Sequence, residues 1–229
     1  MYSSPGVLRL LMVSLLLVLP LTLTGQEQDF QIWSRFALKY DASATTRLYI
    51  EEEFRFRENA QRLDKNHTEF GIAQDLTDRF RIGGFYRFIN LREISGLSNN
   101  RHRFAIQASY DVDLAPWTLW VRPRFQSTFG SIRHSADWNI PELYLRTEAG
   151  ISRRPKGNKI EYHADIEWWF PLEKGQPFYT DQYRLTAGVE FRIDRNRRID
   201  IAYRLQQELQ VNNPERYHII CLTYSHLIR

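Results

Sequence analysis

The stretch YRLTAGVEFRI, residues 183–193, alternates between apolar and polar side chains along most of its length. Leu185 and Phe191 fall on one parity, whereas Arg184 and Glu190 fall on the other. Alternation with a period of two is typical of a β-strand that has one apolar and one polar face. The same alternation recurs in residues 46–56, 100–112, 160–170 and 199–209. Helical spacing is not evident, so we predict an all-β protein.

The alternating segments predict eleven strands, most of them 11–14 residues long. They cover residues 29–40, 46–58, 66–76, 79–91, 100–113, 117–127, 142–153, 159–170, 181–194, 197–209 and 216–228. Strands of soluble proteins average five to six residues, whereas a tilted membrane strand needs about 9–11. Bacterial barrels generally have an even number of strands. We therefore expect an antiparallel transmembrane β-barrel of 10–12 strands, in which either 29–40 does not span or 128–141 hides one more strand.

The connections between these segments alternate in length. The short ones cover residues 41–45, 77–78, 114–116, 154–158 and 195–196, and the longer ones cover residues 59–65, 92–99, 128–141, 171–180 and 210–215. Short turns at one rim and long loops at the other are typical of outer-membrane barrels. Aromatic residues eight to ten positions apart, such as Phe30 and Tyr40 or Trp117 and Phe125, also fit the two interfaces of a membrane. A soluble sandwich, with its apolar face inward, is the alternative.

Residues 1–25 are predicted to be a signal peptide, and residues 26–229 the barrel. Arg9 precedes an apolar run from Leu10 to Thr24, and small residues then precede a polar segment. The chain has 31 Lys or Arg and 27 Asp or Glu residues, for a formal net charge of +4. The cations are mostly arginines spread among acidic residues, which indicates paired charges and no nucleic-acid partner. The single cysteine, Cys221, excludes a disulfide framework.

The polar face is rich in arginine and glutamate. It includes Glu51, Glu53, Arg55, Arg57, Arg79, Arg81, Arg87, Arg122, Arg124, Glu142, Arg146 and Glu148. Guanidinium and carboxylate groups form two-point hydrogen bonds, so a ladder of such pairs would link opposite walls of a narrow lumen. Structural ion pairs and a selective or binding lumen are both open interpretations.

Candidate catalytic or metal-binding residues give weak signals. No histidine pair has zinc-site spacing. The run Glu51-Glu52-Glu53 could suggest a calcium site, but in a strand Glu52 points to the opposite face from its two neighbours. A lipid hydrolase could use His163 with Asp165 and Glu167, or His218 or His226, but Ser225 and His226 point to opposite faces. Cys221 is expected on the lumen side, the pair Gly83-Gly84 to relieve crowding or bend the sheet, and Arg195-Asn196-Arg197-Arg198 to form a basic turn. We assign no catalytic residue, metal site or cofactor.

Several short motifs resemble a known family in order and spacing. They are GIAQDL at 71–76, RFRIGGFYRF at 79–88, RHRF at 101–104, RPRFQ at 122–126, EWWF at 167–170, YRLTAGVE at 183–190 and AYR at 202–204. The chain resembles domain-of-unknown-function family 2490, which consists of predicted outer-membrane β-barrel proteins common in Bacteroidota. The resemblance implies an outer-membrane barrel and assigns no activity.

Three functions follow as expectations. The first is a structural or narrow-pore barrel in the cell outer membrane, with membrane lipids and the barrel-insertion machinery as partners and an unknown solute. The second is a membrane-embedded lipid hydrolase. The third is a soluble periplasmic β-protein that binds an apolar ligand.

Overall fold

The computed structural model describes residues 28–92, 98–130, 141–173 and 175–229, so the predicted signal peptide lies outside the described residues. Eleven strands fill most of this part: β1 (Gln28–Asp41), β2 (Thr46–Arg57), β3 (Arg62–Asp75), β4 (Phe80–Arg92), β5 (Ser98–Leu114), β6 (Trp117–Phe129), β7 (Glu142–Arg153), β8 (Ile160–Pro171), β9 (Gln182–Arg192), β10 (Arg197–Glu208) and β11 (Arg216–Ile228). Within these residues, we find no helix with the length and hydropathy to cross a membrane.

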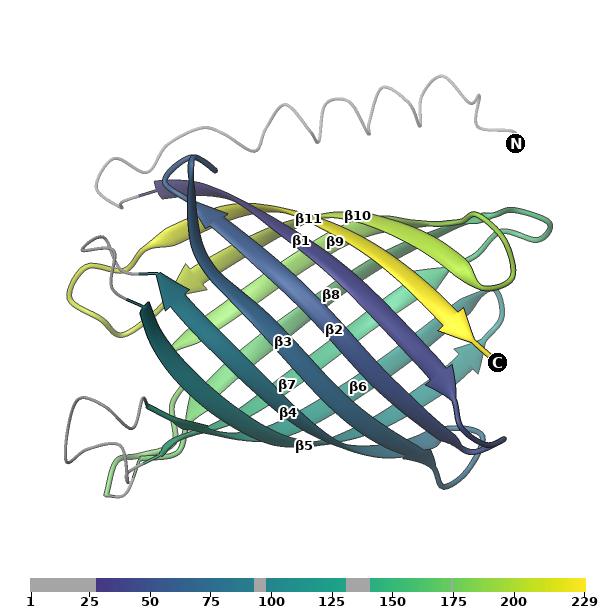
Figure 1. Ribbon diagram of the computed structural model, residues 1–229, viewed down its shortest axis with the longest axis horizontal. Coiled ribbons are helices and arrows are strands. Elements are labelled where there is room, and N and C mark those ends of the chain that lie inside the picture. The colour runs from purple at the N-terminus through teal and green to yellow at the C-terminus, as the bar shows by residue number, and fades with distance from the viewer. Residues whose placement is uncertain (1–27, 93–97, 131–140, 174) are drawn as a thin grey trace, which may run out of the picture.

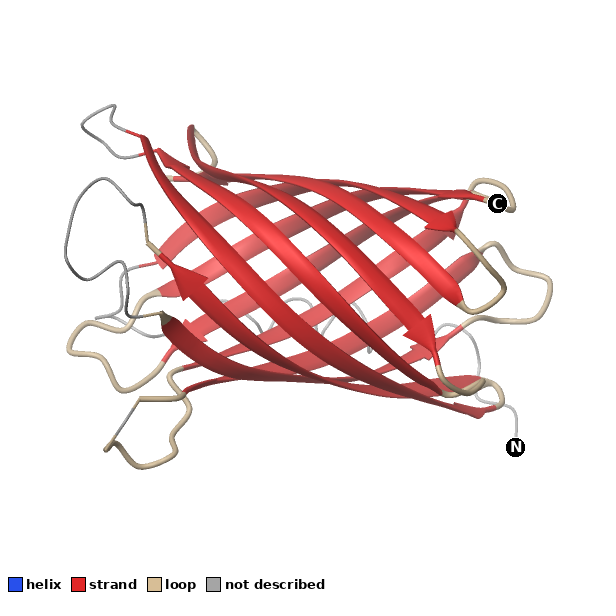
Figure 2. Ribbon diagram, turned by 60° about the horizontal axis from the view of Figure 1, so that its bottom comes forward, coloured by secondary structure: helices blue, strands red, loops and turns tan. Residues whose placement is uncertain are grey.

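The strands form one closed barrel in which each strand pairs with its neighbours in sequence. Figure 1 shows the strongly tilted strands, and Figure 2 shows that they form a continuous wall around the barrel axis. Closure removes the free sheet edges that would otherwise expose unpaired backbone groups. The predicted all-β barrel is therefore confirmed.

The odd strand number has a topological consequence. Every consecutive pair is antiparallel, but β1 and β11 pair in parallel, from Gln28 opposite Arg216 to Tyr40 opposite Ile228. An odd number of alternating strands can close only through one parallel pair. The start of β1 and the end of β11 consequently lie at opposite rims of the barrel (Figure 1).

Two sequence expectations need correction. Residues 29–40 form a complete strand, so the doubt about their spanning was wrong, while residues 131–140 lie outside the described part. The connection predicted at 59–65 is also shorter, because β3 already begins at Arg62. Its polar first residues resemble a loop, yet they pair with β2 across a bulge at Arg55 and Phe56. The turn between them is tight, with positive φ at Glu58, Asn59 and Ala60.

The barrel reverses the polarity of a soluble protein. Large apolar side chains are exposed on the outside of the strands, as for Ile106 at 68% exposure and Phe36 at 56%. Charged side chains are buried inside, as for Glu53 at 4% and Arg184 at 6%. Large contiguous apolar surfaces are rare on soluble monomers and indicate contact with a membrane or a partner. The outer surface is thus of the outer-membrane type.

The parallel closure predicts a specific cross-link. Ala37 and Ser225 are paired partners, so in a Cys221→Ser background the variant Ala37→Cys/Ser225→Cys should form a disulfide under mild oxidation. The readout is a reducible mobility shift of the folded protein on a gel. Ala37→Cys/Leu227→Cys, displaced by two residues along β11, is the control, because its Cα atoms are too far apart for a disulfide. Equal cross-linking of both variants, or of the control alone, would contradict the register.

Candidate functional site

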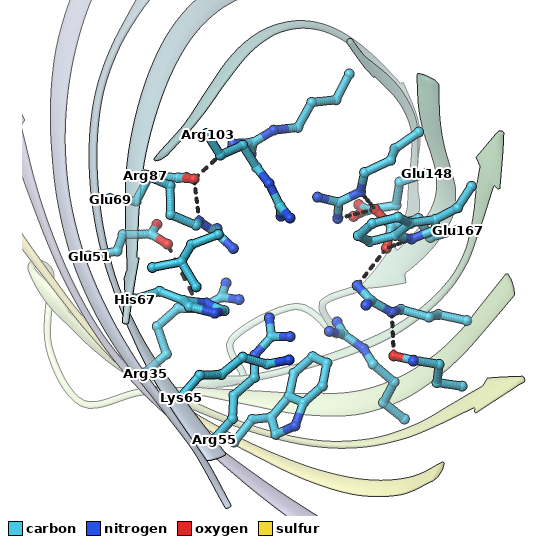
Figure 3. A pocket seen from close by; sticks show the side chains of 18 of the residues that line it. Arg35, Glu51, Arg55, Lys65, His67, Glu69, Arg87, Arg103, Glu148 and Glu167 are labelled. Atoms are coloured by element: carbon cyan, nitrogen blue, oxygen red, sulfur yellow. Dashed lines mark hydrogen bonds and ion pairs between the residues drawn. The ribbon is translucent and has the colours of Figure 1, made fainter. Parts of the chain in front are cut away.

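A cavity of about 820 Å³ lies inside the barrel, and side chains from all eleven strands line it. Asp29, Glu58 and Glu215 line it near one rim, whereas Lys39 and Arg81 line it near the other. The cavity therefore follows the barrel from one end toward the other. Figure 3 shows the labelled side chains pointing from the walls into this space.

The lining of the cavity carries more positive than negative charge. It contains 14 arginine or lysine side chains and 10 aspartate or glutamate side chains, an excess of four positive charges. Five of the carboxylates belong to residues close to the rim formed by the start of β1: Asp29, Glu58, Asp64, Glu208 and Glu215. The positive excess is accordingly concentrated deeper in the lumen.

Three buried carboxylates organise the arginines of the lumen. Each contacts two guanidinium groups: Glu53 contacts Arg35 and Arg55, Glu69 contacts Arg87 and Arg124, and Glu167 contacts Arg146 and Arg184. The two contacts of Glu69 are short, at 2.7 Å from Arg87 Nε and 2.8 Å from Arg124 Nη2 to the same Oε2 atom. Charge-assisted hydrogen bonds of this kind fix both partners in position.

These contacts connect distant strands. Glu69 lies on β3 and Arg124 on β6, with β4 and β5 between them. The ring of Trp33 adds a second connection, because the Arg55 guanidinium carbon lies 3.5 Å from its centroid and that of Arg184 lies 5.4 Å from it. Cation–π contacts stabilise such stacks most where water is scarce. The lumen is thus braced across its width as well as along its wall.

Glycines make room for rings in the lumen. A Cβ atom at Gly71 would clash with the Phe85 ring, and one at Gly83 would lie 2.9 Å from it. The predicted role of Gly83 in relieving crowding is therefore confirmed, whereas a Cβ atom at Gly84 would meet open space. The guanidinium carbon of Arg124 lies 4.8 Å from the centroid of the accommodated ring.

His163, a candidate base, occupies a smaller cavity of about 90 Å³ beside the lumen. Its Nε2 atom lies 2.7 Å from Asp200, whereas Nδ1 is 4.0 Å from Asp165. Gly188 admits the imidazole, because a Cβ atom there would lie 2.5 Å from His163 Nε2. Cys221 lines the same cavity and so faces inward, as predicted. Sequence reasoning did not find Asp200, which comes from β10, two strands away.

The other candidates are separated. Ser225 and His226 are adjacent on β11 and alternate between faces, and His218 lies on the outer surface with Nδ1 2.6 Å from the Tyr203 hydroxyl. Glu52 also faces outward, where it accepts hydrogen bonds from Asn66 and Thr68. Among the described residues no three His, Cys, Asp or Glu side chains gather closely enough to hold a metal ion.

The predicted basic turn lies between β9 and β10, and Asp194 organises it. Its carboxylate accepts hydrogen bonds from Arg197 Nε and from the backbone amides of Asn196 and Arg197. The Arg197 side chain, followed by the two amides, lowers the pKa of Asp194 to about 2. The turn is therefore held by a carboxylate that is ionised at neutral pH, and Arg195 and Arg197 are both exposed on it.

Glu69 provides a test of the shared carboxylates. Replacing it by Gln removes the charge that Arg87 and Arg124 share, and the loss of one partner from a buried ionic network costs about 3 kcal/mol. We expect a lower urea midpoint for Glu69→Gln, measured by tryptophan fluorescence in lipid vesicles. Glu58→Gln, which removes an exposed ion pair with Arg62, is the control and should leave the midpoint unchanged. Equal midpoints for both variants would show that the shared carboxylate is dispensable.

Several solved structures are similar to this chain. The β domain of the Bordetella autotransporter BrkA is 11% identical, with 76% of this chain and 81% of that chain covered and a TM-score of 0.44. A bacterial polysaccharide outer membrane secretin is 12% identical, with 77% and 73% covered and a TM-score of 0.44. The translocator domain of the autotransporter NalP from Neisseria meningitidis is 13% identical, with 77% and 72% covered and a TM-score of 0.35.

No curated protein matches this sequence. A family model described as "Protein of unknown function (DUF2490)" matches residues 30–218, which include part or all of every strand from β1 to β11. The match covers far more than half of the chain, and the resemblance inferred from the sequence motifs is confirmed. The protein belongs to this family, DUF2490.

Proposed function

We propose that the protein is an outer-membrane β-barrel whose lumen is a narrow, water-filled pore for small polar solutes. The observation that carries the proposal is the combination of an apolar outer surface with a charged cavity lined by residues near both rims. A membrane barrel requires this polarity, because lipid contacts its outside and water fills its inside. A soluble β-protein that binds an apolar ligand would need the opposite arrangement.

Strand length and aromatic placement support the membrane location. The strands have 11–17 residues, enough to cross a bilayer at a tilt. Tyr40, Trp117 and Tyr162 are exposed near the rim with the short turns, and Phe30 and Phe125 are exposed toward the other rim. Aromatic side chains favour the interface between hydrocarbon and headgroups. In this proposal membrane lipids surround the barrel and the barrel-insertion machinery places it there.

The proposal includes no catalysis. A lipid hydrolase needs a nucleophile and a base side by side where lipid can reach them. His163 faces the small cavity beside the lumen and bonds to Asp200, while Ser225 and His226 lie on opposite faces. His218 faces outward, but its hydrogen-bond partner is the phenol of Tyr203. The lumen, with its larger cavity and its charge, is the better candidate for function.

Neighbouring residues of β5 test the membrane location. Ile106 is exposed on the outside near the middle of the strand, and Gln107 lines the lumen. Lysine at a lipid-facing midplane position costs about 2–4 kcal/mol. We expect this loss for Ile106→Lys in lipid vesicles and a much smaller one for Gln107→Lys, measured by urea unfolding. The reverse order, or recovery of the protein as a soluble periplasmic product, would contradict the membrane location.

Planar bilayers test the pore. Purified folded protein should give discrete current steps in KCl, smaller than those of 16-stranded porins, because side chains occupy more of a narrow barrel. Protein denatured by heat in detergent serves as the control and should give no steps. A folded preparation that inserts into vesicles but never conducts would show that the barrel is structural.

A further inference from the structure

Arg103 on β5 is a cation in the lumen without a carboxylate partner among the described residues. Its Nε atom donates to Thr128 Oγ1 at 2.9 Å, and the charged side chains that act on it most strongly are all arginines: Arg87, Arg146, Arg55 and Arg124. Figure 3 shows Arg103 reaching into the centre of the lumen. A guanidinium whose strongest charged neighbours are all cations is stabilised by a negative charge nearby.

Two further donors, both on the neighbouring strand β6, lack acceptors. Gln126, which is 0% exposed, accepts from Arg146 Nη1 through Oε1, but its Nε2 atom has no partner. The Nε atom of Arg124 is also buried without a partner, although its Nη2 atom bonds to Glu69. Buried donors are nearly always satisfied, so each exception requires an explanation. Both residues lie on β6, where Gln126 pairs with Ala105 and Arg124 pairs with Gln107 of β5. Arg124 lines the lumen cavity, whereas Gln126 is fully buried and contacts the lining residue Arg146.

The surrounding charges do not compensate for this surplus. Glu69 and Glu167 are each shared between two arginines. Each of these groups therefore keeps one net positive charge, and Arg103 adds another. Such a region favours a multivalent anion over a monovalent one, because attraction scales with the product of the charges. Planar guanidinium groups also match the oxygen spacing of phosphate.

We propose that Arg103, Arg124 and Arg146, hereafter the oxyanion site, bind a phosphate group within the lumen, as inorganic phosphate or as a phosphate ester, while Gln126 holds Arg146 in place. Its oxygens would accept hydrogen bonds from the guanidinium groups that line the cavity, and rings of arginine are a known means of selecting phosphate in pores. This proposal deepens the proposed function and rests on it for its physiological meaning, but the binding itself does not depend on conduction.

Calorimetric titration of the folded protein in detergent micelles tests the site directly. Inorganic phosphate, glycerol 3-phosphate and nitrate are titrated in turn at pH 7.5 and constant ionic strength. We expect both phosphates to bind at least tenfold more tightly than nitrate. Tighter binding of the inorganic ion assigns free phosphate as the ligand, and tighter binding of glycerol 3-phosphate assigns a phosphate ester.

Variants separate a defined site from general attraction. Arg103→Gln should weaken phosphate binding at least tenfold, and it should fold because it removes a cation repelled by its neighbours. Gln126→Glu places a carboxylate against Arg146 of the site and should weaken binding similarly, because it supplies that arginine with a partner. Arg204→Gln is the matched control: Arg204 also lines the lumen and donates to a threonine, Thr186, but it stacks on Trp33 elsewhere in the lumen. It should change binding less than threefold.

The outcomes keep the two proposals apart. Equal affinity for phosphate and nitrate, or equal weakening by Arg103→Gln and Arg204→Gln, would overturn the oxyanion site whether or not the barrel conducts. If Arg103→Gln fails to fold, the wild-type titrations and Gln126→Glu still decide. Phosphate binding without current in planar bilayers would refute the pore and leave the oxyanion site intact. Current without phosphate binding would refute the oxyanion site and leave the pore intact.

Discussion

The sharing of each buried carboxylate by two guanidinium groups is the interaction on which the interior depends. Glu53, Glu69 and Glu167 each fix a pair of arginines, and Glu69 and Arg124 join strands that are not neighbours. Around Glu69 and Glu167 the ratio of two cations to one anion fixes the side chains but leaves charge uncompensated, whereas Arg35 beside Glu53 also contacts Glu51. Uncompensated charge is costly away from water. The lumen must therefore remain hydrated or bind anions, and a cavity of about 820 Å³ is the structural result.

Aromatic rings limit the width of this interior. Trp33, Trp169 and Phe85 lie among the arginines, and the Trp169 centroid is 4.0 Å from the Arg146 guanidinium carbon and 4.4 Å from that of Arg184. The rings hold cationic groups without neutralising them. A cationic lumen that is braced by rings is narrow and positive at once, and these are the properties required to discriminate among small anions.

The barrel also shows how an odd strand number can be accommodated. The parallel pair of β1 and β11 is continuous over thirteen residue pairs, so the closing seam is as long as the antiparallel ones. A complete seam satisfies the backbone groups that a bilayer could not hydrate. The cost of the odd number is not in hydrogen bonding. The odd number instead changes the topology, because the first and last strands run in the same direction.

Alternation along the sequence was sufficient to locate all eleven strands and to assign residues such as Leu185 and Arg184 to opposite faces, because a strand has a strict period of two. It did not reveal that β3 begins at Arg62, because a bulge pairs residues whose polarity resembles that of a loop. The sequence placed Arg124 on the polar face, but it could not select Glu69, 55 residues away, as its partner. The tilt and closure of the barrel determine that contact and the pairing of His163 with Asp200. They also leave Arg103 without a carboxylate partner among the described residues. The physical reason is that local period fixes which way a side chain points, whereas register around a closed sheet fixes what it meets.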